Sequence, residues 1–205
     1  MHLGVDFDNT LVSYDELFYR CALERGLVPA DLPRTKSAVR AHLWKRPDGN
    51  TPWTELQGFV YGTRMAEAAF FPGAREALAL CRERGIRVSI ISHKLEFPAL
   101  GPRVSLRKAS LEWMETQGFF NSAGIGLGRD AVFFESSRED KLARIAGERC
   151  THFVDDLPEV LADPGFPAGA EKWYFDPTGR AEAPAGARRF GSWAEIRACL
   201  EAIAP

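Results

Sequence analysis

Apolar runs alternate with amphipathic stretches through most of the chain. Short runs rich in Val, Ile and Phe predict strands over 3–7, 87–91, 131–134 and 152–154. Apolar residues that recur at helical spacing between these runs predict helices over 74–84, 106–117 and 139–147. This alternation is typical of βαβ units, so we expect an α/β fold with a parallel sheet flanked by helices on both faces.

The connection after the first strand is far longer than one crossover helix needs. It contains three helical candidates separated by Pro and Gly, over 16–25, 35–45 and 54–70. Thr54 and Gln57 form a capping box that would start the third of these helices. The pattern therefore predicts a small helical insert.

These boundaries predict a chain of two domains. The core is expected to consist of residues 1–13 and 72–205, and residues 14–71 are expected to stand over the carboxyl edge of its sheet. The stretch 163–187 is dense in Pro, Gly and Ala, which predicts an irregular wrap with one short strand over 172–175. Ser192 and Glu195 form a second capping box that predicts the start of the last helix.

Composition excludes several classes of protein. The chain has 205 residues, of which 45% are hydrophobic and 26% charged, as in ordinary globular proteins. Its formal net charge of −2 argues against general electrostatic binding to nucleic acid or a membrane surface. The four cysteines form no CxxC pair, so we expect small core residues and neither a zinc site nor disulfides. Without a visible signal peptide or membrane span, a cytoplasmic protein is expected.

Two aspartates, Asp6 and Asp8, bracket Phe7 where the first strand ends. Residues i and i+2 of a strand point the same way, so both carboxylates would enter one small volume. Like charges that close repel each other unless a cation neutralises them or one is protonated. The pair therefore suggests a divalent metal with an acid/base group, although solvated carboxylates in a turn would give the same string.

Further polar groups follow other predicted strands. Ser92 ends the second core strand, Asp155 and Asp156 end the fourth, and Lys141 begins the helix before that strand. Open α/β sheets bind ligands at the carboxyl ends of their strands, so these groups are expected to converge. Taken alone, each has an ordinary alternative: a capping hydroxyl, a solvated lysine and an aspartate pair at a helix N-terminus.

Together these groups fit phosphoryl transfer. The transferred group carries negative charge, which calls for a metal ion, a lysine and neutral donors around it. A carboxylate can attack phosphorus to give an acyl phosphate, while a neighbouring carboxyl acts as acid and then as base. Acidic oxygen ligands suit Mg²⁺, which is the expected cofactor.

The order DFDNT, Ser92, Lys141 and Asp155–Asp156 resembles the haloacid dehalogenase-like (HAD) superfamily. The strings FFPGAREAL and ERGIRVSIIS also look like that family, and the resemblance covers the whole core. It implies a Rossmann-like parallel sheet flanked by helices, and the position of the insert corresponds to a small helical cap of the C1 type.

The resemblance also implies a role for each matching residue. Asp6 would be the nucleophile that becomes an aspartyl phosphate, and Asp8 would protonate the leaving oxygen and then activate water. Ser92 would donate a hydrogen bond to a phosphoryl oxygen, and Lys141 would neutralise the phosphoryl oxygens and the nucleophile. Thr10 would support the loop after the first strand.

The implied metal ligands are Asp6, the backbone carbonyl of Asp8, Asp155, and Asp156 either directly or through water. Dehalogenases of the superfamily lack an aspartate two residues after the nucleophile, because cleavage of a carbon–halogen bond needs no leaving-group acid. The presence of Asp8 therefore favours phosphate ester chemistry.

Substrate contacts are expected from Asn9 and Thr10 after the first strand and from His93 and Lys94 after Ser92. Arg40 belongs to a basic stretch of the insert and could reach a second anionic group on the substrate. The simpler interpretation of that stretch is a solvated helix face beside aromatic residues of the cap core.

The expected function is Mg²⁺-dependent hydrolysis of a phosphomonoester, through an aspartyl phosphate, on a small phosphorylated metabolite. A sugar phosphate is favoured. The alternatives are a nucleotidase, a phosphotransferase or mutase of the same superfamily, and a non-catalytic phosphate-binding HAD scaffold. No nucleic-acid polymer or membrane partner is expected, and both a monomer and a homodimer remain open.

Overall fold

The computed structural model describes residues 1–179 and 181–203. The chain divides into two compact units, each assembled from separate segments. Unit 1 consists of Met1–Val12, Phe70–Lys94 and Gly118–Pro205, and unit 2 consists of Ser13–Ala69 and Leu95–Gln117. In the described residues no helix is long and apolar enough to cross a membrane.

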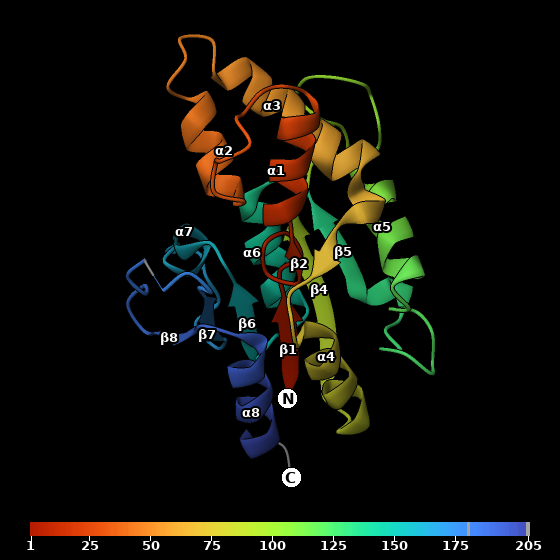
Figure 1. Ribbon diagram of the computed structural model, residues 1–205. Coiled ribbons are helices and arrows are strands. Elements are labelled where there is room, and N and C mark those ends of the chain that lie inside the picture. Colours follow the sequence, from red (N-terminus) through yellow and green to blue (C-terminus); the bar gives the residue numbers. More distant parts are fainter. Residues whose placement is uncertain (180, 204–205) are drawn as a thin grey trace. The chain divides into compact units, whose positions relative to one another are not determined.

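Unit 1 is built on a six-stranded sheet in the order β5-β4-β1-β6-β7-β8, in which every neighbouring pair is parallel (Figure 1). The strands are β1 (His2–Val5), β4 (Arg87–His93), β5 (Val132–Glu135), β6 (His152–Asp155), β7 (Glu171–Phe175) and β8 (Ala187–Phe190). The chain runs from β1 through β4 to β5 and then returns to β6 on the other side of β1. The predicted α/β fold is confirmed.

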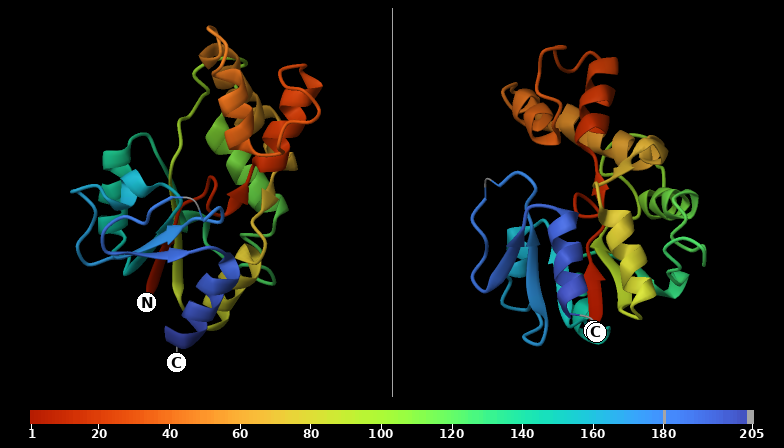
Figure 2. Two further views of the ribbon diagram at one scale, coloured as in Figure 1. Left: turned by 60° about the vertical axis from the view of Figure 1, so that its left-hand side comes forward. Right: turned by 60° about the horizontal axis from the view of Figure 1, so that its bottom comes forward.

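Helices cover both faces of this sheet. They are α4 (Ala74–Glu83), the 3-10 helix η3 (Arg129–Ala131), α6 (Arg138–Gly147), α7 (Pro158–Leu161) and α8 (Trp193–Ile203). Figure 2 shows α4 and α8 side by side on one face, with α6 and α7 on the opposite face. Because both faces are covered, all four residues of β1 are buried, as expected for a central parallel strand.

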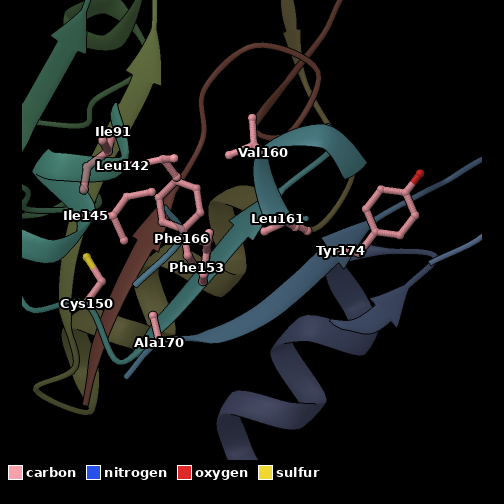
Figure 3. Close-up of a cluster of buried hydrophobic side chains, with 10 residues drawn as sticks. All are labelled: Ile91, Leu142, Ile145, Cys150, Phe153, Val160, Leu161, Phe166, Ala170 and Tyr174. Carbon is pink, nitrogen blue, oxygen red and sulfur yellow. The ribbon is translucent and has the colours of Figure 1, made fainter. Parts of the chain in front are cut away.

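The face under α6 and α7 carries a cluster of buried apolar side chains (Figure 3). Ile145 of α6, Phe153 of β6 and Leu161 of α7 are fully buried within it. Cys150 belongs to the same cluster, and all four cysteines are free and buried, as predicted. The cluster fixes the height of α6 above the sheet, and α6 carries Lys141.

The packing of this cluster requires a glycine at Gly4, because a side chain there would clash with two of its members. A Cβ atom at Gly4 would lie 2.5 Å from Cδ2 of Phe153 and 2.8 Å from Sγ of Cys150. Phe153 also lies beneath the Lys141 ammonium, 5.4 Å from the centre of its ring. A glycine in a central strand therefore leaves room for an aromatic ring that contacts both β1 and the lysine.

Unit 2 is mainly helical. Its elements are α1 (Asp15–Glu24), α2 (Lys36–Leu43), α3 (Asn50–Gly58), the π-helix η1 (Phe59–Thr63), the 3-10 helix η2 (Met65–Glu67) and α5 (Leu106–Thr116). Its core contains an aromatic cluster in which Phe18 stacks on Trp53 and meets Tyr61 edge to face. At the two ends of segment 13–69, β2 (Val12–Ser13) and β3 (Ala69–Phe70) form a two-stranded sheet.

The structure corrects four local predictions. Residues 95–117 group with unit 2 and not with the core, because α5 packs against η1 and η2. The expected helix over 54–70 starts earlier, at Asn50, and it is not one α-helix: α3 ends at Gly58 and passes directly into η1, which η2 follows. Thr54 is therefore no N-cap: it lies inside α3, and its hydroxyl donates to the backbone carbonyl of Asn50 at 2.8 Å. The stretch 163–187, which was expected to be irregular apart from one strand, leads into the strand β8, which was not predicted.

We expect Gly4→Ala to lower the free energy of unfolding by about 1–3 kcal/mol, because Phe153 and Cys150 must move. Gly147→Ala is the matched control: no atom lies within 4 Å of the added Cβ, and alanine favours the helix. Urea unfolding of both variants measures the difference. Equal stability of Gly4→Ala and wild type would contradict the packing argument.

Candidate active site

The loop after β1 carries the two aspartates of the DFDNT string. The Asp6 amide donates to the carbonyl of Val154 at 2.9 Å, which continues the pairing of β1 with β6. Beyond Asp6 the chain turns back, since the amides of Leu11 and Val12 both donate to the carbonyl of Phe7 at 3.1 Å. Asn9 adopts a left-handed conformation with φ of 61° in this turn, which asparagine tolerates better than most residues.

Strand order brings the other predicted groups to Asp6. Ser92 is part of β4 on one side of β1, and Asp155 ends β6 on the other side. The Ser92 hydroxyl donates to Oδ1 of Asp6 at 2.9 Å, and both residues are buried. The order of the strands switches at β1, because the chain adds β4 and β5 on one side of it and β6, β7 and β8 on the other, and open α/β sheets form ligand sites at such a switch point.

Lys141 connects the two buried aspartates. Its Nζ lies 2.6 Å from Oδ1 of Asp6 and 2.7 Å from Oδ2 of Asp155. Burial by itself disfavours the ammonium, but the carboxylates of Asp155 and Asp6 outweigh it and raise the pKa of Lys141 above its ordinary value. The lysine is therefore held as a cation between two acids.

The surroundings of Asp155 disfavour its charged form mainly because the carboxyl is buried. Burial raises the pKa of Asp155 to about 6, and the nearby Asp6 carboxylate adds to this rise while Lys141 opposes it. One oxygen of Asp155 also accepts the amide of Leu157 at 2.9 Å. Burial therefore outweighs the stabilisation that Lys141 gives to the Asp155 carboxylate.

Asp6, Asp155 and Asp156 each offer an oxygen to one point, and these three oxygens lie within 4.8 Å of one another. With Asp8, the site contains four carboxylates, and the ammonium groups of Lys141 and Lys94 pair with three of them. A divalent cation would add positive charge beside these carboxylates, and carboxylate oxygens are the ligands that Mg²⁺ prefers. The residues present therefore fit the expected metal.

The carboxylate of Asp8 has a different partner. Nζ of Lys94 lies 2.6 Å from Oδ2 of Asp8, and the Lys94 residue is only 4% exposed. Among the described residues, the group of acids that could hold a metal does not include the Asp8 carboxylate. This agrees with a role in which Asp8 supplies only its backbone carbonyl to a metal, a role that stays a prediction.

These side chains open into a cavity of about 120 Å³ within unit 1. It is lined by Asp6, Asp8, Asn9, Ser92, His93, Arg138, Lys141, Asp156, Leu157 and Val160. Pockets for drug-sized ligands usually measure about 300–1,000 Å³, so this cavity fits a small group such as a phosphoryl group and a cation.

Of the four residues after β1 and after Ser92 that were predicted to contact substrate, two line the cavity and two do not. Asn9 and His93 line the cavity, and His93 places Nε2 at 3.1 Å from the carbonyl of Ser136. Thr10 is fully buried, and its hydroxyl donates to Oδ1 of Asp156 at 3.2 Å, so it orients a candidate metal ligand. Lys94 is not one of the described residues that line the cavity.

Arg40 belongs to α2 of unit 2, where its guanidinium lies 5.0 Å from the ring centre of Trp44. It is exposed, and its neighbours in the basic stretch make local contacts: Arg34 pairs with Glu16, and Arg46 pairs with Asp48. A contact between Arg40 and the substrate stays a prediction.

Three residues of the cavity wall were not expected from the sequence. Leu157 is 40% exposed and lies beside the buried Val160, and both follow Asp156 closely in the chain. Arg138 lies three residues before Lys141 and pairs at 3.8 Å with Asp163. The sequence could have indicated these three residues because they lie close to Asp156 or Lys141 along the chain. Residues next to a site residue at the end of a strand or helix tend to line the same cavity.

No family model and no curated protein sequence matches this chain. Solved structures do match its fold. A HAD family hydrolase from Deinococcus radiodurans with bound phosphate and sodium is 20% identical, with a TM-score of 0.58 over 98% of this chain and 95% of that one. The HAD hydrolase YfnB from Bacillus subtilis, bound to magnesium, is 12% identical, with a TM-score of 0.59 over 97% of each chain.

A dehalogenase also matches, at 13% identity and a TM-score of 0.52 over 97% of this chain and 96% of that one. The chain therefore has the fold of the HAD hydrolases. Since hydrolases of different chemistry share this fold, the reaction must be argued from the site.

We expect Lys141→Met to lower the free energy of unfolding by about 3–5 kcal/mol at neutral pH without added metal, because Asp6 and Asp155 lose their shared cation. Adding Asp155→Asn should recover part of this loss, since one buried charge is removed. Lys172→Met, at a half-buried lysine above the Phe166 ring, is the control for losing a packed ammonium. Urea unfolding measures all three, and a stable Lys141→Met single variant would contradict the argument.

Proposed function

We propose that the protein is a Mg²⁺-dependent phosphomonoester hydrolase of the HAD superfamily that acts through an aspartyl phosphate on Asp6. The observation that carries this proposal is the convergence of Asp6, Ser92, Lys141 and Asp156 on one small cavity that Asp8 also lines. Each of these groups matches a need of phosphoryl transfer: a nucleophile, donors for the phosphoryl oxygens, metal ligands and an acid.

In the first step a carboxylate oxygen of Asp6 attacks phosphorus, and the bond from phosphorus to the leaving oxygen breaks. Ser92 and Lys141 both donate to Oδ1 of Asp6, which holds the carboxylate in one orientation before the attack. The same two donors are placed to stabilise negative charge on the phosphoryl oxygens. Asp8 in its carboxylic acid form gives its proton to the leaving oxygen.

In the second step Asp8, now a carboxylate, takes a proton from water as that water attacks the phosphorus of the aspartyl phosphate. The bond from phosphorus to Asp6 breaks, and inorganic phosphate and the free carboxylate result. Mg²⁺ held by Asp6, Asp155 and Asp156 would supply charge neutralisation for the phosphoryl group. Thr10 maintains Asp156 in place for this task.

Asp8 distinguishes this chemistry from dehalogenation, which needs no leaving-group acid. The phosphate bound in the Deinococcus radiodurans hydrolase and the magnesium bound in YfnB also support the proposal, as ligands of proteins with the same fold. The small cavity favours a substrate whose phosphoryl group alone enters it, such as a small sugar phosphate.

Asp6→Asn is expected to lower the hydrolysis of phosphomonoesters by at least about 10⁴-fold, because the amide is a poor nucleophile. Glu139→Gln, which removes one exposed acid from α6, is the control and should keep activity. A wild-type reaction in ¹⁸O-labelled water should place one labelled oxygen in the phosphate released. Full activity of Asp6→Asn would overturn the mechanism, and phosphate without label would indicate a different bond cleavage.

Adding Mg²⁺ should stabilise the wild-type protein against heat by mass action, by about 2.7 kcal/mol at 100 times its dissociation constant. Asp156→Asn should lose most of this gain because a ligand oxygen is replaced by an amide. Glu139→Gln again serves as the control, with a gain like that of wild type. Thermal unfolding with and without Mg²⁺ measures the effect, and an equal gain in Asp156→Asn would remove this residue from the site.

A further inference from the structure

Lys94 is a buried cation for which the proposed reaction has no role so far. Its Nζ lies 2.6 Å from Oδ2 of Asp8, and its side chain is 3% exposed against 20% for Asp8. Lys94 thus lies deeper in the protein than Asp8, which lines the cavity. A lysine that bound the phosphoryl group would need to reach the cavity itself.

The position of Lys94 is fixed by several contacts. Its backbone amide donates to the carbonyl of Glu135 at 2.9 Å, which extends the pairing of β4 with β5 by one residue. Its ammonium lies 5.5 Å from the ring centre of Phe7, the residue between Asp6 and Asp8. The ammonium is therefore held in place from β4 and from the β1 loop, and with it the Asp8 oxygen that it binds.

We propose that Lys94 is a positioning residue that sets the orientation of the Asp8 carboxyl for proton transfer to the leaving oxygen. This inference rests on the proposed function. In the step concerned, the proton moves from the Asp8 carboxyl to the leaving oxygen as the bond from phosphorus to that oxygen breaks. Lys94 keeps its own protons throughout and anchors Oδ2.

This role has a consequence that depends on the leaving group. An alkoxide is a poor leaving group and requires the proton, whereas p-nitrophenolate is stable as an anion at neutral pH and leaves without it. Loss of the Lys94 contact with Asp8 should therefore impair cleavage of alkyl phosphates much more than cleavage of p-nitrophenyl phosphate. A lysine that bound the phosphoryl group, or merely stabilised the fold, would affect both substrates equally.

The experiment compares kcat/KM for glycerol 2-phosphate and for p-nitrophenyl phosphate in one preparation of each variant, with saturating Mg²⁺. This parameter reports the steps up to transfer of the phosphoryl group to Asp6, and the ratio of the two values is independent of the fraction of folded enzyme. In Lys94→Met the ratio of alkyl to aryl kcat/KM should fall by about 10²-fold, within the range of general acid catalysis. Lys94→Arg should restore part of the ratio because it restores a donor.

Lys172→Met, which also removes an ammonium above a phenylalanine ring, should leave the ratio unchanged. An unchanged ratio in Lys94→Met, whether both values fall or neither does, would overturn the positioning role. Wild-type enzyme that cleaves neither substrate would instead contradict the proposed function. The two failures are therefore distinguishable.

Discussion

The mutual repulsion of carboxylates at the carboxyl ends of β1 and β6 is the constraint on which the rest of the site depends. Asp6 and Asp155 are both buried, so they require a cation that is buried with them. Lys141 meets this requirement only because α6 is fixed above the sheet by the apolar cluster and because Gly4 leaves room for Phe153. Core packing and site electrostatics are therefore coupled through one lysine.

The main features of the site could be predicted because they depend on short-range patterns. Asp6 and Asp8 line one cavity, as their i, i+2 spacing predicted, although β1 ends before them. The carboxyl ends of parallel strands share an edge, so Ser92 and Asp155 had to approach Asp6. The contact of Lys141 with Asp6 and Asp155 follows from a helix that directly precedes β6. Position in the fold was sufficient for these residues.

Other features depend on contacts between distant parts of the chain. The contact of the Lys94 ammonium with Asp8 is one of these, and no local pattern around Lys94 indicates it. The assignment of α5 to unit 2 reflects its packing on η1 and η2, and β8 forms because β7 offers it a partner. Thr54 had the spacing of a cap, but the helix had already started at Asn50.

The strand order also has a consequence for synthesis of the chain. β1 precedes both of its neighbours in the chain, since β4 and β6 begin only at Arg87 and His152. Segment 13–69 of unit 2 is made in between. β1, a central strand whose four residues are all buried in the fold, therefore has no partner on its β6 side until His152 has been translated, and an unpaired strand edge of this kind favours association of the nascent chain.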